Sequence, residues 1–211
     1  MRLISVKRGA MFGLDARITL AIFGALSVIS GAALYSAILN SKATALLSEL
    51  IEAGKAWEQY YLDTGQSLSR LGADPAVGLF YNFNTSELNV DNGASGWKGP
   101  YLSYSFINGA FAEHPIYGNM HLLAFNNKTW GGNYDPRVVN SSNGQCLAGD
   151  TCYLWSHFHT ITNLSLIKNI DELVDNGDGA DSGNFRWNEF SGISGSNRVY
   201  LKIAPIKNPN G

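Results

Sequence analysis

The sequence predicts an α+β fold in which one long N-terminal α-helix packs on a small antiparallel β-sheet. Residues 12 to 62 contain neither a proline nor a glycine-rich turn, so nothing interrupts a helical pattern there. The second half of the chain holds short runs of aromatic and β-branched residues separated by turn clusters, which is typical of antiparallel strands. With 211 residues, the chain has room for one soluble domain beyond the apolar part of the helix.

The first half of the predicted helix is apolar enough to cross a membrane. No charged residue occurs from Ile18 to Leu39, and a helix of this length spans roughly 33 Å. The preceding ten residues carry Arg2, Lys7 and Arg8 without an acid. This charge bias predicts a cytoplasmic N-terminus and transfer of the C-terminal part across the membrane.

One acid, Asp15, stands at the edge of the apolar run. An ionised carboxylate near hydrocarbon is costly unless it is paired. A cationic N-terminus on a neighbouring subunit would serve as its partner and would fix the axial offset between subunits. Alternatively, Asp15 and Arg17 lie at the lipid headgroup boundary, with Arg17 extending outward.

The first residues follow a characteristic order. A short basic segment, MRLISVKRGA, ends in the small residue Ala10, and Asp15 is the fifth residue counted from Met11, ahead of the unbroken apolar helix. This order resembles that of the type IV pilin and pseudopilin superfamily. The resemblance implies a leader peptide at 1–10, a transmembrane or filament-core helix at 11–39, an amphipathic continuation at 40–63 and a globular head at 64–211.

The same resemblance implies processing and location. Prepilin peptidase would cleave between Ala10 and Met11 on the cytoplasmic face and methylate the new amine of Met11. Family leaders usually end in Gly, but cleavage after Gly9 would make Asp15 the sixth residue, so Ala10 is the predicted site. The family has Glu at the position of Asp15 and an apolar residue at that of Arg17. We expect a single-pass inner-membrane protein with a periplasmic head before assembly, and a surface or periplasmic filament afterwards.

Residues 40–62 predict an amphipathic continuation of the helix. Apolar or small residues recur at steps of three and four, whereas charged residues occupy the other faces. The helix is expected to end at Asp63-Thr64-Gly65, where Gly65 supplies a left-handed cap. The predicted buried stripe is Ala43, Leu46, Leu47, Leu50, Gly54, Trp57 and Tyr61.

The predicted head combines a long loop, a sheet and a second helix. The loop covers Gln66–Gly96, with a short helix near Pro75–Phe80, and ends in the turn Trp97-Lys98-Gly99-Pro100-Tyr101. That turn is similar to a Trp-x-Gly-Pro-Tyr turn of pseudopilins and minor pilins. Helical spacing predicts the second helix over Thr160–Val174, capped by Thr162 or Asn163. The expected strands are Tyr101–Ile107, His121–Phe125, Cys152–Phe158 and Arg198–Ile206.

Charge and cysteine content narrow the function further. The formal net charge is −2, and residues 1–38 contribute +3, which leaves −5 for the remainder and predicts no nucleic-acid partner. Cys146 and Cys152 close the short loop CLAGDTC, which in a translocated domain predicts a disulfide, with a free thiol pair as the alternative. Their spacing fits neither CxxC redox chemistry nor a zinc site.

The stretch from Asp171 to Trp187 is rich in Asp, Asn and Gly and has two interpretations. Its acids could hold calcium, with Asp175, Asp178 and Asp181 as candidate ligands, and a late calcium site is also a feature of the major pseudopilins. The stretch lacks the EF-hand pattern and its closing bidentate Glu. A capping and turn role is therefore favoured, and no cofactor is expected.

No residue pattern predicts catalysis, so we expect that the protein is not an enzyme. His157 and His159 alternate along a predicted strand and share a face. His114 and His121 are expected in a separate loop region, so a third zinc ligand is missing. No serine lies in a Gly-x-Ser-x-Gly elbow, and no phosphate-binding loop occurs.

These features predict a structural subunit of a type IV pilus-like filament. Its expected partners are other pilin-like subunits, prepilin peptidase, an inner-membrane assembly platform and the membrane itself. A minor pilin or a pseudopilin of a type II secretion system is the related alternative. A second is a permanently anchored periplasmic module that binds carbohydrate or another envelope partner through its Tyr-, Trp- and Asn-rich surface. A third is an anchored hydrolase using His157 and His159.

Overall fold

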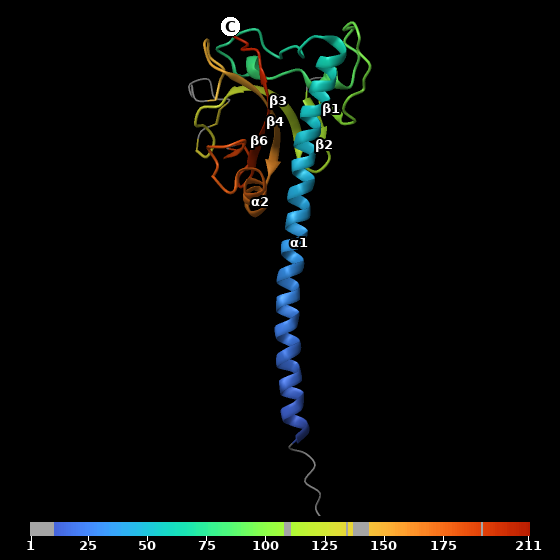
Figure 1. Cartoon of the computed structure of the whole chain (residues 1–211), viewed down its shortest axis with the longest axis vertical. Coiled ribbons are helices and arrows are strands. Elements are labelled where there is room, and N and C mark those ends of the chain that lie inside the picture. The colour runs from blue at the N-terminus through green and yellow to red at the C-terminus, as the bar shows by residue number, and fades with distance from the viewer. Residues whose placement is uncertain (1–10, 108–110, 134, 137–143, 191) are drawn as a thin grey trace, which may run out of the picture. The chain divides into compact units, whose positions relative to one another are not determined.

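The computed structural model describes residues 11–107, 111–133, 135–136, 144–190 and 192–211, so the leader predicted at 1–10 lies outside the described residues. Helix α1 covers Met11–Thr64 and helix α2 covers Leu164–Asp175, with short 3₁₀ helices η1 at Gly78–Tyr81 and η2 at Thr85–Leu88 (Figure 1). The strands are β1 (Ser105–Ile107), β2 (Phe111–His114), β3 (Gly118–Asn126), β4 (Cys152–Ile161), β5 (Phe185–Glu189) and β6 (Asn197–Ile206). The predicted α+β class is confirmed.

The six strands form one antiparallel sheet in the order β1-β2-β3-β4-β6-β5. Each of the four predicted strand regions contains a strand, but β1 begins at Ser105 and not at Tyr101. The reason is that the backbone N–H groups of Tyr101 and Leu102 both donate to the carbonyl of Leu88, 2.6 and 3.3 Å away, which ties this segment to η2. Strands β2 and β5 were not predicted.

Strand β5 was not predicted because polar residues alternate with aromatic residues along it. Phe185 and Trp187 are separated by Arg186, and Asn188 follows. All four side chains are nevertheless buried. Arg186 lies over the rings of Trp130 and Trp155, and the Asn188 side chain accepts a hydrogen bond from the hydroxyl of Tyr200 at 2.8 Å. Tertiary contacts therefore supply the partners that these polar groups need in the interior.

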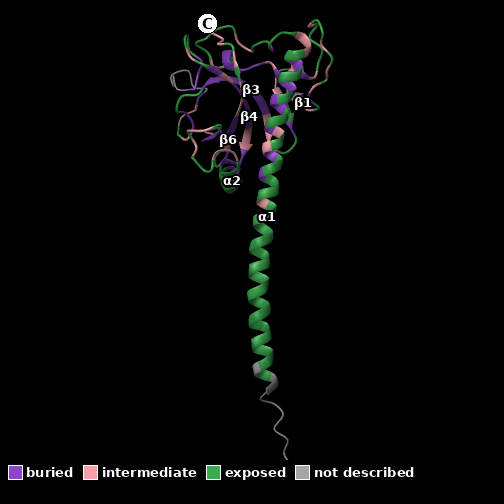
Figure 2. Ribbon diagram, in the orientation of Figure 1, coloured by how far each residue is buried: buried purple, intermediate pink, exposed green. Residues whose placement is uncertain are grey.

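The second half of α1 is amphipathic, as predicted, but its buried stripe differs in detail (Figure 2). The buried members are Ala43, Leu46, Leu50, Ala53, Gly54, Ala56, Trp57 and Tyr60. Tyr61 is 47% exposed, so its predicted burial is wrong, and Leu47 is half-buried. Tyr60 takes the interior position because its hydroxyl meets Glu87 and Asn92 in the head, at 3.4 and 2.9 Å.

The end of α1 is as predicted. The helix stops at Thr64, and Gly65 follows with φ of +68°, donating its N–H to the Tyr61 carbonyl at 2.8 Å. Gly54 allows the close approach of helix to sheet, because a Cβ at this position would lie 2.6 Å from Cγ2 of Ile203 on β6. The second half of α1 therefore packs on the face of the sheet that carries Ile203.

The opposite face of the sheet carries a core of large aromatic residues. Its members are Phe80, Tyr81, Leu123, Phe125, Trp130, Cys146, Cys152, Trp155 and Tyr200. The sheet is thus covered by helix α1 on one side and by loop residues on the other.

Helix α2 begins after Asn163, whose side chain accepts a hydrogen bond from the Leu166 N–H at 3.1 Å, as predicted for one of the two candidate caps.

Candidate functional site

The first part of α1 presents an uncovered apolar surface. Nine Ile, Leu, Val or Phe side chains between Ile18 and Ile38 are 46–73% exposed. By length and composition, one helix of the described residues, over Asp15–Thr64, is a candidate membrane span. The predicted membrane-spanning segment is therefore present as a candidate span.

The predicted processing and assembly residues lie at the start of this surface. Ala10 lies outside the described residues, and Met11 is the first residue of α1. Asp15 and Arg17 are exposed on the helix, and neither makes an ion pair with any described residue. The structure thus places two unneutralised charges of opposite sign at the edge of an apolar surface.

The predicted disulfide between Cys146 and Cys152 is confirmed. Both cysteines are buried, at 0% and 1% exposure, within the aromatic core. The loop that they close also holds the C-terminal segment, because Asn208 donates to the carbonyls of Leu147 and Asp150, both at 2.8 Å. The loop closed by the disulfide therefore contacts the C-terminal segment, which is far from it in sequence.

The Asp-rich stretch brings three carboxylates together. Oxygens of Asp171, Asp175 and Asp178 lie within 4.8 Å of one another. Two of them are predicted calcium candidates, whereas Asp181 is not in the group and Asp171, from α2, was not among the candidates. The helical spacing of 171 and 175, one turn apart, is the signal that could have identified Asp171.

The contacts of these carboxylates favour the capping and turn role. Oδ2 of Asp175 accepts hydrogen bonds from the backbone N–H groups of Asn184 and Phe185 at 2.7 and 2.6 Å. Oδ2 of Asp171 accepts from the Gly179 N–H at 3.2 Å, while its Oδ1 is buried without a hydrogen-bond donor among the described residues. Burial raises the pKa of Asp171 to about 6, helped by the nearby charges of Asp178 and Asp175. Asp171 and Asp175 of α2 therefore hold the loop that follows the helix, by accepting hydrogen bonds from its backbone N–H groups.

The expected separation of His121 from His157 and His159 is wrong. His121 lies on β3 directly opposite His157 on β4, and the rings of His121, His157 and His159 have centroids 5.1–5.4 Å apart. His114, at the end of β2, contacts Phe158 and so lies on the other face of the sheet. The spacing along the chain could not show this, because strand pairing brings His121 to the predicted pair.

The three histidines belong to an aromatic layer. The ring of His157 stacks on Tyr200, with centroids 4.6 Å apart, and His159 lies 4.6 Å from Phe190. His157 is fully buried, which leaves no path for a substrate in solvent to reach its ring. This environment favours packing over the hydrolase alternative.

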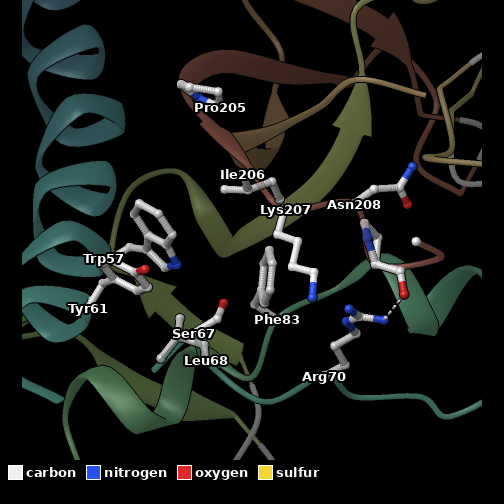
Figure 3. Close-up of a pocket in the computed structure, with 12 residues that line it drawn as sticks. Trp57, Tyr61, Ser67, Leu68, Arg70, Phe83, Pro205, Ile206, Lys207 and Asn208 are labelled. Atoms are coloured by element: carbon white, nitrogen blue, oxygen red, sulfur yellow. Dashed lines mark hydrogen bonds between the residues drawn. The ribbon is translucent and has the colours of Figure 1, made fainter. Parts of the chain in front are cut away.

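A pocket in the head was not anticipated. It encloses about 410 Å³ between the end of α1, the segment that follows it and the last residues of the chain (Figure 3). Its wall includes Trp57, Tyr61, Arg70 and Lys207. We call it the C-terminal pocket.

Comparison of the chain with protein-family models, curated proteins and solved structures found no match.

Proposed function

We propose that the chain is a structural subunit of a type IV pilus-like filament. The observation that carries this proposal is one continuous helix, Met11–Thr64, whose second half is buried on its own sheet while its first half is apolar and exposed. Removing a Leu, Ile or Phe side chain from water gains about 1.5–3 kcal/mol. The exposed surface therefore requires a cover that the described residues do not supply.

Two covers fit the same surface in succession. Lipid covers it while the subunit is held in the membrane, and the helices of neighbouring subunits cover it in a filament. A helix that could enter either environment needs no change of fold between them. Because the subunit can leave the membrane without refolding, we favour a filament subunit over a protein that remains in lipid.

Asp15 supports the assembly role. It is exposed and has no ion-pair partner within the described part of the chain. In an apolar filament core an unpaired carboxylate is expensive, so a cation from an adjacent subunit would be favoured beside it. The amine produced by cleavage between Ala10 and Met11 has the required charge, and it would set the register between subunits.

Two alternatives remain distinct from this role. A minor pilin or secretion pseudopilin uses the same helix in a shorter or mixed filament. A permanently anchored binding module uses the helix only as an anchor and acts through its head, and the C-terminal pocket is the specific observation in its favour. The hydrolase alternative has no comparable observation.

The mature N-terminus separates these possibilities. Mass spectrometry of the protein purified from membranes and from sheared surface material should find N-methylated Met11 as the first residue. Electron microscopy of the sheared material should show filaments that an antibody against the head labels along their length. An intact Met1 in all fractions, with monomers only, would contradict the filament and favour the anchored module. Labelling confined to filament tips would indicate a minor pilin.

A further inference from the structure

The C-terminal pocket has the size of a ligand site. Its volume of about 410 Å³ lies within the range of small-molecule pockets. Trp57 and Tyr61 come from the last turns of α1, Arg70 from the segment after it, and Lys207 from the end of the chain after β6. Figure 3 shows these side chains around one space.

The side chains that line the pocket include two cations and no acid, and the lining also includes Gly211, the last residue of the chain. Arg70 and Lys207 are both exposed, and neither is ion-paired to a carboxylate among the described residues. The guanidinium of Arg70 lies 4.4 Å from the centre of the Phe80 ring and donates to the Pro209 carbonyl at 3.3 Å. These contacts hold Arg70 in place while leaving other N–H groups of the guanidinium for a ligand. The pocket therefore favours an anion.

An aromatic wall faces these charges. The rings of Trp57 and Tyr61 are stacked, with centroids 5.7 Å apart and planes inclined by 16°. Trp57 is 8% exposed, and its Nε1–H is buried without an acceptor in the described part of the chain. In Figure 3 this nitrogen faces the space that Ser67 and Phe83 also border. An unpaired buried donor is costly, so an oxygen atom brought by a ligand would be stabilised here.

The combination of charges and rings selects a class of ligand. A bare inorganic anion would neutralise Arg70 and Lys207 but would leave the aromatic wall without contacts. A neutral sugar would pack on the rings and accept from Trp57 but would bring no negative charge to Arg70 and Lys207. We propose that the C-terminal pocket binds a uronic acid, whose carboxylate pairs with Arg70 and Lys207 while its ring packs on Trp57 and Tyr61.

The test uses the full chain as unassembled subunits in detergent micelles, so that its result does not depend on whether filaments form. Isothermal titration calorimetry with D-galacturonate and with an oligogalacturonate should show saturable binding. Galactose, which differs from galacturonate by the carboxylate, should bind at least about tenfold more weakly. Binding of the oligomer alone would identify a polysaccharide as the source, and equal binding of the monomer a free sugar acid; both support the proposal.

Variants assign the contacts. Arg70→Gln and Lys207→Gln should each weaken galacturonate binding roughly tenfold, and Trp57→Phe, which keeps a ring but removes the N–H, should weaken it severalfold. Lys168→Gln removes an exposed charge from α2 that is not part of the pocket lining, and should leave binding unchanged. Circular dichroism establishes that each variant is folded. The proposal fails if galacturonate and its oligomer do not bind, if galactose or inorganic phosphate binds as tightly, or if Arg70→Gln and Lys207→Gln have no effect.

Discussion

Nε2 of His114 lies 3.7 Å from Oε1 of Glu49, which joins the end of β2 to α1. Nδ1 of His114 accepts hydrogen bonds from the backbone N–H groups of Ile116 and Tyr117 at 3.1 and 3.2 Å, so the ring proton is on Nε2 and faces Glu49. The hydroxyl of Tyr104 donates to the same carboxylate. Glu49 therefore links the helix to this edge of the sheet, by accepting a hydrogen bond from Tyr104 and by lying close to the His114 ring.

Glu49→Ala should destabilise the head. The substitution leaves the Tyr104 hydroxyl without its acceptor, which costs about 1–3 kcal/mol of unfolding free energy. All five tryptophans follow Lys42, so tryptophan fluorescence during urea denaturation in detergent follows this part of the chain. Glu58→Ala, on the exposed face of the same helix, is the control and should change the unfolding free energy by less than about 0.5 kcal/mol. Equal effects of the two substitutions would show that the Glu49 contacts contribute nothing specific.

Asp171 should make the stability of the head depend on pH. Burial raises the pKa of Asp171 in the folded protein from 3.8 to about 6, so the folded state holds this proton more tightly than the unfolded state. The contribution of Asp171 to stability is therefore largest below pH 4 and is lost as the pH rises towards and through 6. At pH 7 the loss amounts to about 3 kcal/mol.

Asp171→Asn should remove this dependence. The amide keeps an acceptor for the Gly179 N–H and carries no charge, so the variant should be more stable than the native protein at pH 7 and similar to it at pH 4. Asp181→Asn, which alters an exposed acid outside the group of three carboxylates, is the control. If added Ca²⁺ raises the melting temperature at pH 7 and Asp171→Asn abolishes that rise, a cation rather than a proton relieves the repulsion.

Removal of the disulfide should weaken the head by about 2 kcal/mol, because the loop closed by Cys146 and Cys152 is short. The double variant Cys146→Ala/Cys152→Ala should therefore unfold at lower urea concentration than the native protein. Dithiothreitol should shift the native protein towards the variant and leave the variant itself unchanged. Detection of two free thiols in native protein unfolded without reductant would contradict the cross-link.

Asp15→Ala should reduce filament yield at least about tenfold, since a loss of 1.4 kcal/mol per contact changes an association constant by that factor. Quantitative immunoblotting of sheared filaments against membrane-held subunits measures the effect. Asp15→Glu keeps the charge and should restore assembly, while Asp181→Ala serves as a control in the head. Normal filament abundance in Asp15→Ala, at equal subunit levels in the membrane, would show that no pairing at Asp15 is needed.

The sequence by itself determined the features that depend on local pattern. The apolar run from Ile18 to Leu39, the cap at Gly65 and a second helix within 160–174 follow from periodicity and from single-residue conformational preferences. The disulfide followed from a short spacing in a chain with only two cysteines. These elements need no information about distant residues.

Only the tertiary structure decided which distant residues meet. Strand pairing placed His121 opposite His157, and helix packing exchanged Tyr61 for Tyr60 in the buried stripe because Glu87 and Asn92 supply partners for the Tyr60 hydroxyl. The polar strand β5 is buried because its side chains find partners in the head. Arg186 lies over the rings of Trp130 and Trp155, and Asn188 accepts a hydrogen bond from Tyr200. The C-terminal pocket likewise joins residues 57 and 207, whose proximity is set by the free energy of packing the whole head rather than by any local pattern.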